Sequence, residues 1–195
     1  MIRTHEELKV YLEADRIALK RSGKAPRFYD EVWRFQRLLR KVEFLLNTMD
    51  QRGPFGRLRH KLLSFALHRQ AVRCGFEIPP NTCGPGLSIA HRGTIIIHPE
   101  ARVGSNCRLH VDVVIGTRPG PMERVPVIGD NCYIGPGAKI FGDIVLGNNI
   151  VVGANSVVNR SFPEGHMTIA GAPAQKVSDT ASDEYIIATR KRTTT

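Results

Sequence analysis

The chain has 195 residues, 42% of them hydrophobic and 24% charged, which suits one globular domain or a small domain joined to a larger one. Its apolar runs are far shorter than the ~20 residues that cross a bilayer, so we expect no membrane partner. Of the formal net charge of +10, residues 1–76 hold most, with 17 Lys and Arg against 8 Asp and Glu. No zinc-finger spacing and no alternation of basic and aromatic residues accompany this charge, so we expect no nucleic-acid partner.

The amino terminus and the cysteines indicate in which cellular compartment the protein lies. Acidic residues stand where a secretory signal would have its apolar core, so we expect a cytoplasmic protein. The four cysteines form no Cys-x-x-Cys pair, which argues against a zinc ribbon or a disulfide framework, and we expect them to be reduced. They are Cys74, Cys83, Cys107 and Cys132.

Residues 1–76 are predicted to form a small α-helical domain. Apolar residues at helical spacing indicate a first helix around residues 8–19, which the Ser22–Pro26 segment ends. A stronger stripe runs from Val32 to Leu46, with Asp30 as a candidate cap and Arg34, Arg37, Arg40 and Lys41 on the other side. A third helix is indicated by Leu58, Leu62, Phe65 and Val72. We expect these stripes to pack within the domain or to form an oligomer contact.

From residue 77 the period changes to six. Aliphatic residues recur at one phase, glycine often follows them, and the fifth position of each hexad is often small. Helices do not repeat at six, whereas short strands joined by tight turns do, and three hexads make one triangular coil of a parallel β-helix. We therefore predict a β-helix domain over residues 77–177, in which residues 78–169 give about five coils, followed by a disordered or loosely packed tail over 178–195. The inward positions are Ile97, Val103, Leu109, Ile115, Ile128, Ile134, Ile140, Leu146, Val152 and Val158.

One break interrupts the hexads. Ile115 and Ile128 are 13 residues apart instead of the 12 of two hexads, and three prolines and two glycines between them indicate an external loop. Long excursions from a regular scaffold often carry function.

The hexads resemble those of the hexapeptide-repeat acyltransferases, which implies an α+β fold with a left-handed parallel β-helix behind the helical domain. The resemblance narrows at the segment Gly86–Ile97, which looks like the active-site coil of serine acetyltransferases. The downstream segments 135–140, 153–158 and 169–174 are similar to coils of the same enzymes that line the coenzyme A groove and close the helix. The resemblance implies an acetyl-CoA-dependent O-acetyltransferase. The acceptor most in keeping with it is L-serine.

His91 is the predicted catalytic base. Acetyl transfer from a thioester to an alcohol needs the hydroxyl proton removed, and a neutral imidazole suits that task near pH 7. The resemblance implies an orienting acid at Glu77, where aspartate is commoner in the relatives. His110 is the alternative base or a substrate contact, because sugar-acetylating relatives have a histidine near it. A metal site built from His91, His98 and His110 would need converging imidazoles, and their spacing does not match that of the β-helical carbonic anhydrases, so we expect no metal.

The resemblance also implies substrate contacts. Arg124 matches an arginine that contacts the acceptor, whereas Val125 and Ala90 replace a histidine and an aspartate. This difference leaves a sugar or nucleotide-sugar hydroxyl as the alternative acceptor, and a non-catalytic scaffold as a further alternative. Predicted contacts to acetyl-CoA come from small residues on the outer face and from two lysines. They are Gly116, Gly135, Ala138, Lys139, Ala154 and Lys176.

The resemblance bears finally on assembly. Family members are trimers with sites between subunits, so we expect a homotrimer or a dimer of trimers. The chain ends in Thr195, not in the isoleucine with which some relatives dock on cysteine synthase, and we expect no such partner.

Overall fold

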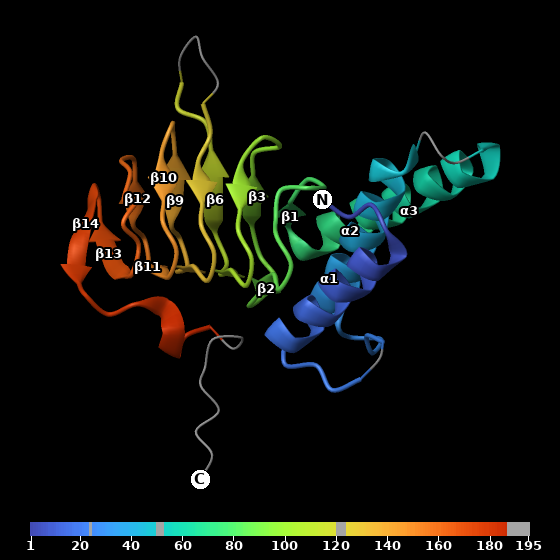
Figure 1. The fold of residues 1–195 in the computed structure, drawn as a ribbon, viewed down its shortest axis with the longest axis horizontal. Helices are drawn as coiled ribbons and strands as arrows, with labels where there is room; N and C mark the ends of the chain where they lie inside the picture. Colours follow the sequence, from blue (N-terminus) through green and yellow to red (C-terminus); the bar gives the residue numbers. More distant parts are fainter. Residues whose placement is uncertain (24, 50–52, 120–123, 187–195) are drawn as a thin grey trace.

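The computed structural model describes residues 1–23, 25–49, 53–119 and 124–186, in which three helices precede a stack of short strands (Figure 1). Helix α1 spans His5–Ala18, α2 spans Glu31–Asn47 and α3 spans Pro54–Cys74. The Thr4 side chain accepts from the backbone of Glu7 in a capping box, and the predicted cap Asp30 accepts from Trp33. Gly75 ends α3 in the left-handed conformation, with φ at 78°. No helix in these ranges is long and apolar enough to span a membrane.

One prediction about the helix faces is wrong, and for a second only one of its two alternatives, packing within the domain, is excluded. Arg40, assigned to the solvated side of α2, is completely buried, while the opposite stripe packs as expected through Phe35, Leu39 and Val42. On α3 the predicted apolar stripe faces solvent, with Leu58, Leu62, Phe65 and Val72 each more than half exposed. The face of α3 that packs is the one with Leu67, Gln70 and Cys74. Figure 1 shows why, because much of α3 extends beyond the coils.

The strands build three sheets around one axis. The first sheet has the order β1-β3-β6-β9-β12, the second β10-β7-β4, and the third β14-β13-β11-β8-β5-β2. All pairs are parallel except β13 with β14. The bounds are β1 Phe76–Glu77, β2 Ser88–Ile89, β3 Ile95–Ile97, β4 Arg102–Val103, β5 Arg108–Leu109, β6 Val113–Gly116, β7 Val127–Ile128, β8 Tyr133–Ile134, β9 Lys139–Phe141, β10 Val145–Leu146, β11 Ile150–Val152, β12 Val157–Val158, β13 Met167–Gly171 and β14 Ala174–Ser178.

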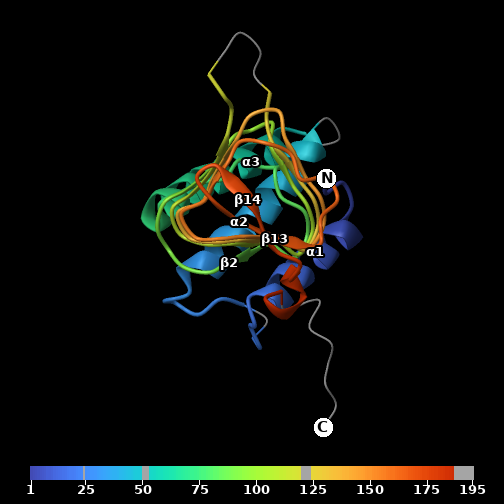
Figure 2. The same cartoon turned by 90° about the vertical axis from the view of Figure 1, so that its left-hand side faces the viewer.

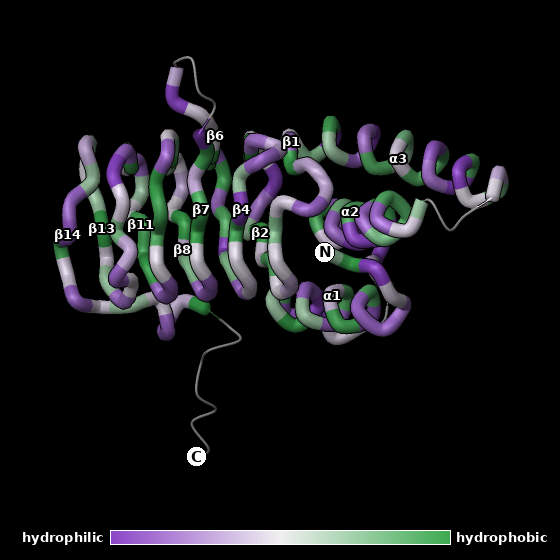
Figure 3. Tube along the Cα trace, turned by 45° about the horizontal axis from the view of Figure 1, so that its top comes forward, coloured by the Kyte–Doolittle hydropathy of each residue, from purple (hydrophilic) through white to green (hydrophobic). Residues whose placement is uncertain are grey.

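The period of six is confirmed by both register and burial. Ile95 pairs with Val113 and Lys139 with Val157, in each case 18 residues on, which is three hexads. All ten predicted inward residues are at most 4% exposed. Seen down the axis, the coils superimpose in a three-sided outline (Figure 2), and hydrophobic segments recur at the same positions along the stacked coils (Figure 3). The division predicted at residue 76 stays a prediction, and β1 begins at that residue.

The loop after β6 replaces one hexad, not two. Ile115 pairs with Ile140, 25 residues on, so this coil has seven residues more than the regular 18. The chain leaves the first sheet at Gly116 and enters the second at Val127, so it turns a single corner. The interpretation of this segment as two hexads with one extra residue is therefore wrong. Of the excursion, residues 120–123 lie outside the described ranges.

Two corners of the three-sided β-helix contain predicted site residues. The histidine corner joins the third sheet to the first and comprises residues 90–94, 110–112, 135–138 and 153–156. The loop corner joins the first sheet to the second and comprises residues 98–101, the described parts of 117–126, and 142–144. Since strands of the first sheet run from the histidine corner to the loop corner, the width of that sheet separates the two.

A buried ionic network joins the helices to the first coil. Arg40 donates to Asp15 at 2.8 Å, to Glu43 at 3.0 Å and to the carbonyl of Cys83 at 2.8 Å. Asp15 also accepts from the backbone amides of Gly86 and Leu87, both at 2.9 Å. The helices thereby supply partners to backbone groups at the open end of the β-helix.

The tail packs more closely than predicted. After β14 the chain forms a short 3₁₀ helix, η2, at Ser182–Glu184. Ser182 is fully buried and its amide donates to the carbonyl of Asn149 at 3.2 Å. The Tyr185 ring lies 5.3 Å from that of Tyr133. The prediction of a loose tail is therefore wrong up to Ile186, and residues 187–195 lie outside the described ranges.

Candidate active site

Two histidines meet at the histidine corner. His91 follows β2 and His110 follows β5, and the pairing of Ile89 with Leu109 brings these two turns together. Their ring centroids are 6.2 Å apart. His91 is exposed and His110 is half-buried. The predicted base and the alternative base therefore belong to one site, and His91 is the one open to solvent.

His110 is held as a neutral ring. Burial, then the charge of Arg108, then that of His91 lower the pKa of His110 to about 4. The Arg108 Nε donates to His110 Nε2 at 3.3 Å, which assigns the ring proton to Nδ1. A base of such low pKa is poorly matched to proton abstraction near pH 7, and its Nε2 lone pair is already occupied. These features favour His91 over His110 as the base.

Glu77 lies on β1 in register with Ile96 and is exposed on the outer side of the first sheet. Within the described ranges, no hydrogen bond joins it to His91. Its orienting role stays a prediction.

Arg124 belongs to the loop corner and Gly116 directly precedes that corner, so neither lies at the histidine corner. Gly116 ends β6, and Arg124 forms an ion pair with Asp143, in which both side chains are more than half exposed. One protomer therefore does not bring Arg124 next to His91.

Some of the predicted coenzyme A contacts are buried and others are accessible to solvent. Gly135 and Ala138 are buried, so their placement on the outer face is wrong. A Cβ on Gly135 would lie 2.7 Å from the Val152 carbonyl oxygen, so the next coil requires this glycine. Ala154 is exposed at the histidine corner. Of the lysines, Lys139 binds Asp112 Oδ1 at 2.9 Å, and Lys176 on β14 binds Asp179 at 2.5 Å.

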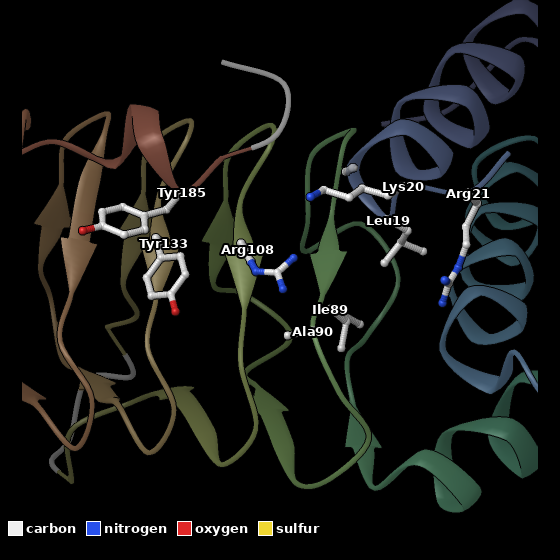
Figure 4. Close-up of a pocket in the computed structure, with 9 residues that line it drawn as sticks. Leu19, Lys20, Arg21, Ile89, Ala90, Arg108, Tyr133 and Tyr185 are labelled. Atoms are coloured by element: carbon white, nitrogen blue, oxygen red, sulfur yellow. The ribbon is translucent and has the colours of Figure 1, made fainter. Parts of the chain in front are cut away.

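A cavity of about 330 Å³ opens between the end of α1 and the third sheet (Figure 4). Two of its lining residues adjoin the histidines, because Ala90 directly precedes His91 and Arg108 donates to His110. Sequence reasoning missed this cavity and all of its polar residues. Arg108 and Tyr133 stand one position before the inward residues Leu109 and Ile134, so the hexad phase alone could have placed both on the outer face. Its nine lining residues are Ala18, Leu19, Lys20, Arg21, Ile89, Ala90, Arg108, Tyr133 and Tyr185.

Comparison with known proteins identifies the repeat and the fold. Residues 126–160 match the family model described as bacterial transferase hexapeptide (six repeats). A serine acetyltransferase of Synechococcus elongatus is 34% identical over 112 residues, which are 56% of this chain and 46% of that enzyme. The soybean serine acetyltransferase, solved in complex with serine, superimposes with a TM-score of 0.69 at 27% identity, over 88% of this chain and 70% of that one.

The chain has the serine acetyltransferase fold. A serine acetyltransferase solved in complex with CoA shows the same fold, with a TM-score of 0.68 at 24% identity over 89% of this chain and 71% of that one. The predicted α+β class, a left-handed parallel β-helix preceded by helices, is thereby confirmed. The chain spans about half the length of the curated relatives it matches. Their activity is therefore considered next as a proposal.

Proposed function

We propose that the protein transfers the acetyl group of acetyl-CoA to the hydroxyl of a small acceptor, with His91 as the general base. The observation that carries this proposal is the exposed His91 beside a cavity at the histidine corner, next to a second histidine that is held neutral. Serine is the first acceptor to test, because the similar proteins are named serine acetyltransferases.

The proposed reaction is a direct displacement. The His91 imidazole takes the proton of the acceptor hydroxyl as its oxygen attacks the thioester carbonyl carbon. A carbon–oxygen bond forms, the carbon–sulfur bond breaks, and the proton passes to the departing thiolate. The products are an acetyl ester and CoA with a free thiol. Glu77 is the proposed orienting acid, since a carboxylate on the second ring nitrogen would stabilise the imidazolium.

Acetyl-CoA is proposed to lie along the outer side of the coils, where Ala154 is exposed. Lys139 and Lys176 are the proposed phosphate contacts, and Gly116 a backbone contact. Each lysine would have to exchange its present carboxylate partner, Asp112 or Asp179, for a phosphate. The solved relative with bound CoA supports this choice of donor. Four buried, free cysteines suit a reducing compartment such as the cytoplasm.

A homotrimer is proposed as the active form, with each site shared by two protomers. The support is the separation of Arg124 from His91 by the width of the first sheet, because a neighbouring protomer can bring its loop corner to the histidine corner. A dimer of trimers, in which the exposed stripe of α3 forms contacts, is a larger assembly of the same kind.

Complementation between two inactive variants tests the shared site. His91→Ala and Arg124→Ala are each expected to be impaired, whereas co-refolded 1:1 mixtures should regain activity at about one quarter of the sites, since random trimers pair an intact His91 with an intact Arg124 that often. Acetyl transfer by the mixture and by each variant alone is the measurement. If every mixture is as inactive as its components, the site is not shared.

A sugar hydroxyl is the second candidate acceptor. The cavity presents the rings of Tyr133 and Tyr185, which could cover the face of a sugar, and none of its lining residues is acidic. An ammonium group would therefore find no carboxylate among them.

Release of the CoA thiol from acetyl-CoA tests the proposed function. The wild-type protein is expected to release thiol only when an acceptor is present, with L-serine, homoserine and nucleotide sugars as the first panel. The acetyl ester is identified by mass spectrometry. A folded protein that neither binds acetyl-CoA in calorimetry nor releases thiol with any acceptor would be a non-catalytic scaffold.

A further inference from the structure

The cavity beside the histidines is formed by three separate parts of the chain. Residues 18–21 at the end of α1 form one wall, strands β2, β5 and β8 form the second, and Tyr185 of the tail forms the third. In Figure 4 the side chain of Lys20 extends toward the coils, whereas that of Arg21 lies along the helices. Its volume of about 330 Å³ is at the low end for small-molecule sites, enough for a compact metabolite.

The charged residues that line this cavity are all basic. Its lining includes Lys20, Arg21 and Arg108 and no acidic residue. Arg21 is balanced by Asp30, to which its Nε donates at 2.8 Å. Within the described ranges, Lys20 has no side-chain partner, and no carboxylate pairs with Arg108. Two positive charges are therefore left without a counter-charge.

Arg108 is fixed in place by neutral groups. Its Nη1 donates to Ser88 Oγ at 2.8 Å, and that hydroxyl donates to the carbonyl of Ala18 at 3.2 Å. Its Nε donates to His110, which leaves Nη2 without a partner among the described residues. A guanidinium held in this way is preorganised to receive an anionic oxygen.

The cavity adjoins the histidine corner. Ala90, which lines it, directly precedes His91. The His110 ring lies 4.8 Å from Tyr133 and 6.2 Å from His91. A molecule anchored on Arg108 therefore lies beside His110, whose ring neighbours that of His91.

We propose that this cavity selects an acceptor that carries an anionic group, a carboxylate or a phosphate, and has no need of an ammonium group. Arg108 and Lys20 bind the anionic oxygens, and the rings of Tyr133 and Tyr185 cover the carbon skeleton. This inference rests on the proposed acetyl transfer and names its acceptor class. The hydroxyl attacks the thioester and the proton leaves through His91, so the products are an acetylated anion and CoA.

Matched acceptors test the inference. 3-Hydroxypropanoate is serine without its ammonium group, and ethanolamine is serine without its carboxylate. Glucose 1-phosphate and glucose form a second pair, which separates a phosphate from a neutral sugar. We expect kcat/KM to be higher for 3-hydroxypropanoate than for serine or ethanolamine, or higher for glucose 1-phosphate than for glucose. A preference for serine or ethanolamine over 3-hydroxypropanoate, without a preference for the phosphate, would overturn the inference and leave the proposed transfer intact.

Two variants test whether Lys20 and Arg108 bind the anionic group of the acceptor. Lys20→Met and Arg108→Met are each expected to raise KM for the anionic acceptor by about 10-fold or more, as for a lost charge-assisted hydrogen bond, with KM for acetyl-CoA unchanged. Lys9→Met, at an exposed lysine on α1 that does not line the cavity, is the matched control and should change neither value. Because Lys20 is exposed, its variant remains informative if Arg108→Met fails to fold.

Binding measurements test the anionic cavity independently of acetyl transfer. Calorimetry with 3-hydroxypropanoate and with glucose 1-phosphate needs no turnover. Binding that is weakened in Lys20→Met supports the anionic pocket even if no acceptor of the panel reacts. Absence of binding by both anions, or equal binding in Lys20→Met, overturns it. If the proposed acetyl transfer is wrong, the observation is a different one, namely that the protein does not bind acetyl-CoA.

Discussion

Replacing His91 with alanine is expected to lower kcat for acetyl transfer by about 10²–10⁴. The variant loses the only exposed imidazole of the histidine corner, and the remaining ring cannot take over. His110 has a pKa of about 4 and its Nε2 accepts from Arg108, so it offers little basicity near neutral pH. Initial rates of thiol release at saturating acetyl-CoA give the comparison, and KM for acetyl-CoA should change little because binding does not need the base.

His166→Ala is the matched control for this experiment. His166 is exposed like His91, and it directly precedes β13, outside both the histidine corner and the loop corner. Its Nε2 lies 3.1 Å from the side-chain Nδ2 of Asn149, a contact between adjacent coils. We expect turnover close to that of the wild type. Near-normal transfer by His91→Ala, or an equal loss in both variants, would contradict the role of His91 as the base.

Arg40→Met is expected to lower the free energy of unfolding by about 3–5 kcal/mol. Burial alone would lower the pKa of Arg40, but Asp15 and Glu43 hold it above its usual value, so the guanidinium stays charged within the protein. Removing it leaves two carboxylates buried without their counter-ion. Urea unfolding followed by circular dichroism, at fixed protein concentration, measures the change.

Arg16→Met provides the comparison for Arg40. Arg16 lies on α1 and pairs with Glu13 at 2.6 Å, and this pair is open to solvent, with 27% of the Arg16 side chain and 56% of the Glu13 side chain exposed. Exposed pairs of this kind contribute about 0–1 kcal/mol. A loss in Arg40→Met no larger than that in Arg16→Met would show that the buried network is dispensable for stability.

The coils were predictable because their geometry leaves few choices. Each inward position must be filled by an aliphatic side chain of similar size, so a residue such as Ile134 is determined by its phase alone. The stacking distance also requires glycine at tight positions such as Gly135, whose Cβ would clash with the next coil. This same requirement explains why small residues were mistaken for an outer binding surface. Glycine there serves the neighbouring coil.

The helical part was predicted less well because periodicity identifies faces without identifying their neighbours. The main partner of Arg40 is Asp15, which is 25 residues away on another helix, and nothing in the local pattern predicts that contact. The stripe of α3 was correctly recognised as apolar, yet within the described chain it meets no partner that buries it. Whether a stripe faces a core or a second protomer is decided by tertiary structure.

The site was predicted in part. His91 and His110 were singled out from the sequence, and the β-helix does bring them together. Arg108 was missed because its importance depends on the lateral contact with His110 and on Ser88 in the preceding coil. Tyr185 was missed because the tail was expected to be loose. Such contacts depend on how the coils and the tail pack, which hexad counting does not specify.

The two ends of the column differ in a way that affects solubility. A stack of parallel strands has unsatisfied edges above and below, and either could accept a strand from another molecule and extend into a fibre. Here Asp15 and Arg40 occupy backbone groups at one end, and β14 reverses direction against β13 at the other. The antiparallel strand β14 covers the edge of β13 to which another parallel coil would add, so the regular stack ends there.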